Sequence, residues 1–215
     1  MREVFKSAKV VYAWLGEESD RSRDAIKKLV EIANTKRASP QAASAKQTID
    51  PSSQLRRVSG ASDPFWNYIN KLLSRRWFRR VWIVQELVLA QEALFLCGKE
   101  KPVPWDDLYM AAKACVEEAE NLTAGLMKEI VQNAEALMNL GALREQWCRP
   151  KSEHVRMGLP LLWLFQSFEH TQSSKRRDKL FAFLSLASDS EDPAFLPNYD
   201  DKLEVVVRHY ASVFV

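Results

Sequence analysis

The 215-residue sequence has few of the side chains that build disulfide frameworks and metal sites. It contains only three cysteines and three histidines, which lie far apart: Cys97, Cys115, Cys148, His154, His170 and His209. No CxxC pair is present, and an odd cysteine count argues against a disulfide framework. The histidines have no ligand spacing with the cysteines, so we predict no metal site and no bound cofactor.

The sequence also lacks a strong surplus of one charge and a long apolar run. Thirty-one basic and twenty-eight acidic residues leave a net charge of +3, which is too small to mark a nucleic-acid binder. The first sixteen residues carry charges through position 9 and only a short apolar run. They match neither a secretory signal nor a membrane span. We therefore expect no nucleic-acid partner, no membrane association and a location in the reducing cytoplasm.

Two short apolar runs, each ended by glycine, have the character of strands. Residues 9–16 are β-branched and aromatic, and their apolar side chains are continuous rather than alternating. Such a run is typical of a strand buried on both faces in a parallel sheet. An amphipathic helical pattern with Ser and Asp start signals follows, which completes half of a βαβ unit. Residues 93–98 form the second strand-like run.

Helical patterns dominate the rest of the chain. They are expected over 63–73, 77–90, 105–119, 121–147, 160–170, 176–187 and 201–214. With only two clear strands, the sequence predicts a helix-rich α/β fold.

Residues 34–62 interrupt these patterns. The segment is rich in Ser, Ala, Lys and Gln, and it has two prolines and almost no large apolar residue. Such a segment buries too little surface to offset its ordering entropy, so we predict a disordered insertion.

Glu86 is the most informative single residue, because it lies in a stretch that is otherwise apolar on nearly every side. A helix over 77–90 with that character belongs in the interior. Burying an unpaired carboxylate costs several kcal/mol, so Glu86 must be paired, be neutral or face a cleft. One hypothesis is a structural ion pair with Arg79 or with a lysine from another element. The other is a carboxylate that is directed into a pocket and held by Trp82.

The same stretch, "WFRRVWIVQELVLA", resembles the sequence pattern of the fungal heterokaryon-incompatibility (HET) domain. The match is carried by Trp77, Phe78, Arg80, Trp82, Gln85 and Glu86. Three further blocks follow the family in the same order, through Ser7, Ala8, Trp14, Leu15 and Gly16, then Gly98 and Trp105, then Arg177, Asp178, Lys179 and Tyr199. The resemblance spans essentially the whole chain and implies a single partial HET domain over residues 1–215.

The family pattern normally opens with two strands, one ending Trp-Gly and one reading roughly Trp-Ile-Asp, and neither is found here. The resemblance therefore implies that the N-terminal portion is missing, through a gene-model error, an alternative start or decay. The strand over 10–15 would then have an unpaired edge, which favours pairing with another chain. We expect oligomers or poor solubility unless 34–62 covers that edge.

HET domains are held to resemble TIR domains, which have a flavodoxin-like parallel sheet flanked by helices and some of which cleave the nicotinamide–ribose bond of NAD. That likeness implies a partial sheet of this kind with additional C-terminal helices. It also implies that Glu86 is the catalytic carboxylate, with Trp82 and Gln85 as substrate-binding neighbours. The reason is that "WIVQEL" has the same Trp-to-Glu spacing as the TIR helix that carries the key glutamate. NAD would be the substrate, and a carboxylate can stabilise the oxocarbenium-like state of its cleavage.

Three functions follow from the resemblance. The first is a cell-death module of non-self recognition that consumes NAD or a related nucleotide. The second is a non-catalytic module that acts by self-association or by docking to other incompatibility proteins. The third is an inactive truncated remnant, since the missing strands would supply much of the rim of a nucleotide pocket.

Overall fold

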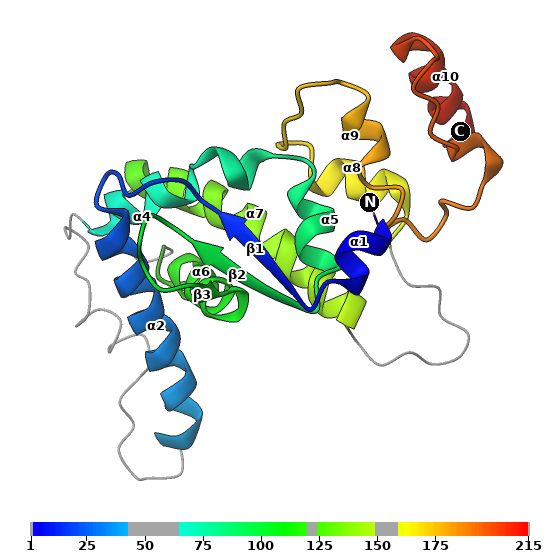
Figure 1. Ribbon diagram of the computed structural model, residues 1–215. Coiled ribbons are helices and arrows are strands. Elements are labelled where there is room, and N and C mark those ends of the chain that lie inside the picture. The colour runs from blue at the N-terminus through cyan, green and yellow to red at the C-terminus, as the bar shows by residue number, and fades with distance from the viewer. Residues whose placement is uncertain (1, 43–64, 120–123, 149–158, 215) are drawn as a thin grey trace. The chain divides into compact units, whose positions relative to one another are not determined.

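The computed structural model describes residues 2–42, 65–119, 124–148 and 159–214 (Figure 1). Its contacts divide the chain into two compact units. In the described parts of the chain, no helix is long and apolar enough to cross a membrane. The sheet unit comprises 10–78 and 92–138, and the helical unit comprises 1–9, 79–91 and 139–215.

The sheet unit contains a three-stranded mixed sheet, with the order β1-β2-β3 in the described residues. β1 (Val10–Trp14) pairs in parallel with β2 (Glu92–Leu96), and β3 (Val103–Pro104) pairs antiparallel with β2. The two predicted strands are confirmed, and so is the helix-rich α/β class. The sequence patterns do not reveal β3, because two residues that include a proline are too short to show a strand period.

Two helices of the sheet unit pack against α2 (Ser22–Ala42). They are α4 (Phe65–Leu73) and α6 (Trp105–Ala119). α6 also contacts β2 and β3. Further along the chain, α7 (Ala124–Cys148) contributes its first part to this unit and its remainder to the helical unit.

Residues 34–42 continue α2, which differs from the disorder predicted for 34–62; residues 43–62 lie outside the described residues. Two ion pairs connect this end of α2 to α6: Lys36 Nζ lies 2.6 Å from a Glu117 carboxylate oxygen, and Arg37 contacts Asp107. The composition of the segment alone could not predict these partners, because they lie about 70 and 80 residues away in the sequence.

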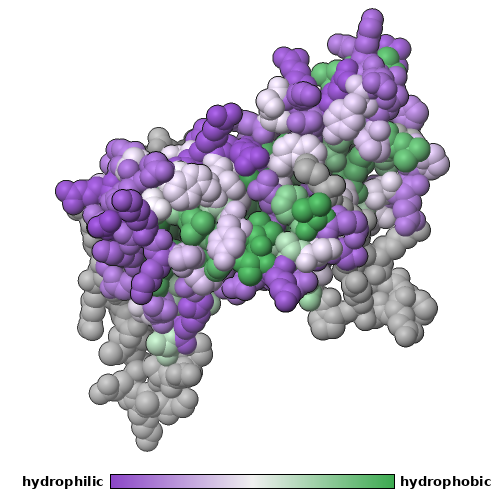
Figure 2. Space-filling model, in the orientation of Figure 1, coloured by the Kyte–Doolittle hydropathy of each residue, from purple (hydrophilic) through white to green (hydrophobic). Residues whose placement is uncertain are grey.

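β1 is buried on one face only. Ala13 is 3% exposed, whereas Tyr12 is 60% and Trp14 is 48% exposed. The prediction that both faces are buried is therefore wrong for this strand, because alternate side chains point to opposite faces and only one face meets the core. In Figure 2, pale aromatic and green apolar side chains gather over β1 and β2. β1 is also an edge strand of the sheet in the described residues, so its outer edge has no strand partner there.

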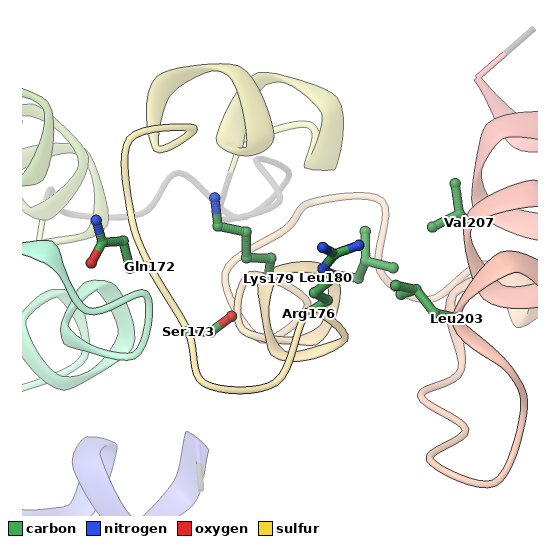
Figure 3. A pocket seen from close by; sticks show the side chains of 7 residues that line it. All are labelled: Gln172, Ser173, Arg176, Lys179, Leu180, Leu203 and Val207. Carbon is green, nitrogen blue, oxygen red and sulfur yellow. The ribbon is translucent and has the colours of Figure 1, made fainter.

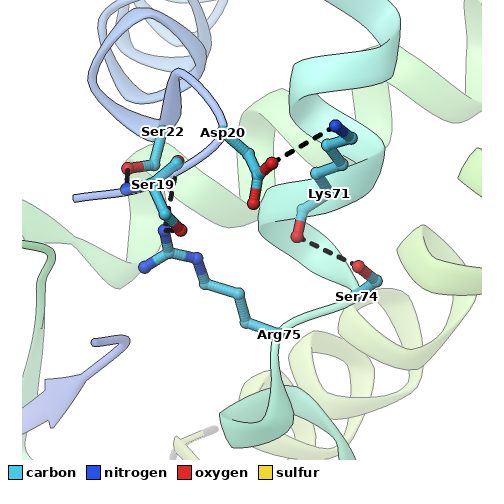
Figure 4. Close-up of polar contacts among 6 residues, drawn as sticks. All are labelled: Ser19, Asp20, Ser22, Lys71, Ser74 and Arg75. Atoms are coloured by element: carbon cyan, nitrogen blue, oxygen red, sulfur yellow. Dashed lines mark hydrogen bonds and ion pairs between the residues drawn. The ribbon is translucent and has the colours of Figure 1, made fainter. Parts of the chain in front are cut away.

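Arg75, just after α4, connects the loops that follow β1 and β2, and Figure 4 shows its contact with Ser19 in the first of these loops. Its Nη1 donates to the Leu15 carbonyl oxygen at 3.0 Å and contacts Cys97 Sγ at 3.1 Å. Its Nη2 donates to Ser19 Oγ at 3.0 Å. Both loops turn at a glycine with positive φ, and a side chain at Gly98 (φ +54°) would come within 3.0 Å of Glu18. The carboxyl ends of the two parallel strands are thus fixed by one guanidinium.

The helical unit is assembled from short helices around an aromatic core. Buried Phe168 stacks on Phe183 at 5.7 Å between ring centroids, and Phe195 meets Tyr210 edge-on at 5.1 Å. Its elements are α1 (Arg2–Ser7), α5 (Ile83–Val88), α8 (Leu161–Ser167), α9 (Asp178–Phe181), the 3-10 turn η2 (Pro193–Phe195) and α10 (Leu203–Val213).

Two predicted helices are shorter than expected. The pattern over 176–187 yields only α9, after which the backbone forms i to i+3 bonds. The prediction of one helix over 77–90 is wrong: a 3-10 helix, η1 (Arg76–Arg79), is followed by a turn and then by α5. The helix is interrupted there because the backbone pairs with Gln172. Val81 N donates to the Gln172 carbonyl oxygen at 2.9 Å, and Gln172 N donates to the Arg79 carbonyl oxygen. The backbone therefore forms a strand-like bridge instead of a helix.

Candidate functional site

The three residues singled out by the sequence lie within five positions, 82–86, at the start of α5. Trp82 is the N-cap residue of this helix, and the Glu86 amide donates to the Trp82 carbonyl oxygen at 3.1 Å. Residues one helical turn apart lie on one side of a helix. Trp82 and Glu86 are therefore neighbours, whereas Gln85 is displaced around the helix and is 3% exposed.

Glu86 lies close to a guanidinium. An Arg80 Nη2 lies 3.7 Å from Glu86 Oε1, and the two side chains are 49% and 18% exposed. That distance fits an ion pair but is too long for a hydrogen bond. The sequence hypothesis named Arg79 or a lysine as the partner; the observed partner is Arg80, because the break before α5 changes the register of the two arginines. The carboxylate is therefore charge-paired but retains partial solvent access.

The environment of Glu86 favours its protonated form. Burial raises the pKa of the Glu86 carboxyl, and the positive charge of Arg80 lowers it by a smaller amount. Desolvation penalises an ionised carboxylate, and a half-exposed guanidinium only partly offsets that penalty. A carboxyl with a raised pKa next to a single cation is a feature of functional sites as well as of structural ion pairs.

Trp82 is oriented by an acid from a distant part of the sequence. Its indole Nε1 donates to Asp178 Oδ2 at 3.3 Å, and Asp178 is the first residue of α9. The second and fourth blocks of the family resemblance therefore meet within the helical unit, through Trp82 and Asp178. Asp178 is not among the site residues predicted from the sequence, where its only signal is its place in the family pattern.

Gln85 points into the protein interior. Its Nε2 donates to the Ala182 carbonyl oxygen, and its buried Oε1 has no hydrogen-bond partner among the described residues. An unsatisfied buried amide oxygen costs free energy. The amide therefore fixes α5 on the segment after α9, and its predicted role in substrate binding stays a prediction.

The C-terminal end of α5 is held by Arg144 from α7. Its Nη1 donates to the carbonyl oxygens of Leu87 and, at 2.7 Å, of Ala90. Its Nη2 donates to the Gln91 carbonyl oxygen at 3.0 Å. The last carbonyls of a helix have no partner within the helix and carry partial negative charge. Arg144 satisfies one of them, at Leu87, and two carbonyls just beyond the helix, at Ala90 and Gln91, which stabilises the segment that carries Glu86.

In the described parts of the chain, no group of three or more His, Cys, Asp or Glu side chains could hold a metal ion. The functional groups gathered at the start of α5 are the Glu86 carboxyl, the Arg80 guanidinium, and the Trp82 indole with its Asp178 partner.

Comparison with known proteins gives a family match over the first part of the chain. Residues 1–86 match the family described as Heterokaryon incompatibility protein (HET), and the matched region ends at Glu86. The resemblance to this family is confirmed over that region. No curated protein and no solved structure gives a significant match.

Proposed function

We propose that the chain is a fungal HET-type module of non-self recognition and programmed cell death, which acts in the cytoplasm by hydrolysing the nicotinamide–ribose bond of NAD(P). The observation that best supports this proposal is Glu86, a largely buried carboxyl with a raised pKa and, among the described residues, a single ion-pair partner at 3.7 Å. The TIR resemblance of the Trp82-to-Glu86 spacing supplies the reaction type.

The proposed reaction needs little from the protein. The bond between the ribose C1′ and the nicotinamide nitrogen breaks, and nicotinamide leaves with the electron pair. The ribose then passes through an oxocarbenium-like state, and water adds to C1′ and releases a proton. Ionised Glu86 would stabilise the developing positive charge or accept a hydrogen bond from a ribose hydroxyl. The indole of Trp82, fixed by Asp178, would provide an aromatic face for the base or ribose.

Expression of the chain in fungal cells tests this proposal. We expect the wild type to lower cellular NAD and to kill cells, and Glu86→Gln to do neither, because the amide keeps the shape but not the charge. Glu135→Gln is the matched control, since Glu135 is an exposed glutamate on α7. Killing with unchanged NAD, or full NAD loss with Glu86→Gln, would exclude this mechanism.

We propose as the second candidate a non-catalytic module that acts by self-association or by docking to other incompatibility proteins. The outer edge of β1 and the exposed Tyr12 and Trp14 support this candidate. An unpaired strand edge beside apolar side chains favours pairing with another chain. Cell killing that persists in Glu86→Gln but is lost when β1 is altered would favour this function over hydrolysis.

A further inference from the structure

A cavity of about 460 Å³ lies in the helical unit (Figure 3). Its lining includes none of the residues of the candidate site, although the backbone of Gln172 in this lining pairs with that of Arg80. Its polar side is formed by Gln172, Ser173, Arg176 and Lys179. Its apolar side is formed by Leu180, Leu203 and Val207. This volume is in the range of sites that hold small molecules. We propose that the cavity binds a small phosphate monoester whose organic part is apolar or aromatic.

Two cations with free hydrogen-bonding capacity define the polar side. The exposed guanidinium of Arg176 has no hydrogen-bond or ion-pair partner among the described residues. Lys179 Nζ donates one hydrogen bond, to the Glu169 carbonyl oxygen at 3.0 Å, so two of its protons remain available. The Lys179 amide donates to the Arg176 carbonyl oxygen, which places the two residues one turn apart. Like charges at that spacing repel each other, and a bound anion removes the repulsion.

The charge of the two cations identifies the anion. A phosphate monoester carries about −1.5 to −2 charges near pH 7 and has three acceptor oxygens. It therefore neutralises both cations, whereas a carboxylate would neutralise one. A guanidinium binds phosphate through two parallel hydrogen bonds, and an ammonium acts as a point charge. The Gln172 amide can donate further hydrogen bonds, while the Ser173 hydroxyl already donates to the Lys175 carbonyl oxygen at 2.7 Å.

The apolar side identifies the rest of the ligand. Leu203 and Val207 are one turn apart on α10, and Figure 3 shows Arg176 between them and Lys179. Val207 is 46% exposed, so apolar surface here faces solvent. Covering such surface lowers the free energy in proportion to the area removed from water. A phosphate ester with an apolar body should therefore bind more tightly than inorganic phosphate.

Isothermal titration calorimetry of the whole chain tests this inference with phenyl phosphate, adenosine monophosphate, inorganic phosphate and phenol. We expect one phenyl phosphate per chain, bound more tightly than either inorganic phosphate or phenol. Arg176→Gln should weaken the binding of phenyl phosphate about tenfold. Val207→Ser should reduce only the difference in affinity between phenyl phosphate and inorganic phosphate. Lys175→Gln, the same loss of charge one residue away from the cavity lining, should change the affinity less than twofold.

Lys179→Gln provides a second variant if Arg176→Gln unfolds. No measurable binding of either phosphate ester, or equal weakening by Lys175→Gln and Arg176→Gln, would overturn the inference. Tighter binding of a phosphotyrosyl peptide than of both small esters would overturn the assignment to small molecules. The inference does not depend on NAD hydrolysis, because Glu86→Gln should bind phenyl phosphate as the wild type does.

Discussion

At the scale of single residues, Glu86 differs from an ordinary surface glutamate because burial raises its pKa against the opposing effect of Arg80. The folded protein therefore holds the Glu86 proton to a higher pH than the unfolded chain does. This contribution to stability is fully present below the unfolded pKa and is lost as the pH rises through the folded pKa. At a pH where the side chain is ionised, its burial costs stability, which natural proteins accept mainly where function requires it.

The pH dependence of Glu86→Gln follows from this sign. The amide is neutral throughout, so the stability of the variant relative to wild type should increase between pH 4 and pH 7.5. Urea unfolding at both values measures the difference, with Glu135→Gln as the exposed control. A variant that loses stability relative to wild type over this range would mean that the ion pair with Arg80 outweighs desolvation.

Tyr210 gives a second prediction for a single side chain. Its hydroxyl donates to the Phe195 carbonyl oxygen at 3.1 Å, and burial, with a smaller effect of Tyr199, raises its pKa to about 12. The phenol is therefore a neutral donor at physiological pH. Tyr210→Phe leaves a buried carbonyl without this donor and should lower the free energy of unfolding by about 1–2 kcal/mol. The exposed Tyr12→Phe should change it little, and equal effects of the two would contradict this role.

At the scale of elements, α5 is a six-residue helix whose end is fixed by Arg144. Arg144→Ala removes the donors to three carbonyl oxygens and should lower the free energy of unfolding by about 1–3 kcal/mol. Arg144→Lys should restore only part of this free energy, because an ammonium lacks the planar, forked set of donors of a guanidinium. Denaturant unfolding measures both, with Arg208→Ala, at an exposed position of α10, as the control. Full rescue by lysine would show that charge alone is sufficient.

Sequence patterns predicted elements well where local periodicity is strong. The stretch from Trp105 to Ala119 is helical as expected, and both glycine-ended runs contain strands. The prediction of one helix over 77–90 is wrong because the backbone there pairs with Gln172, more than 80 residues later in the sequence. A bridge of that kind leaves no local signal.

The candidate site shows the same division. Trp82, Gln85 and Glu86 could be found because they are close in sequence and lie in a family pattern. Asp178 and Arg144, which hold this segment, reach it only through tertiary packing. Their roles can therefore be identified only from the folded structure.

At the scale of the whole molecule, the outer edge of β1 is the feature most relevant to association. Its exposed Trp14 and Tyr12 lie on one face beside Leu94 and Leu96 of β2. We expect wild-type chain to form dimers or larger oligomers, and Trp14→Lys to shift it toward monomer, because a lysine on an edge strand opposes pairing. Light scattering coupled to size-exclusion chromatography measures the mass, with Lys9→Gln as a control. A stable wild-type monomer at high concentration would contradict this expectation.

Release of nicotinamide from NAD by the purified chain is the most direct measurement of the proposed activity. Assays should compare wild type, Glu86→Gln and Glu135→Gln, each confirmed as folded by circular dichroism. We expect equal release of nicotinamide and ADP-ribose by wild type and by Glu135→Gln, and at least a hundredfold slower release by Glu86→Gln, a loss typical when a transition-state charge loses its partner. Equal rates for wild type and Glu86→Gln would contradict a catalytic role for this carboxylate.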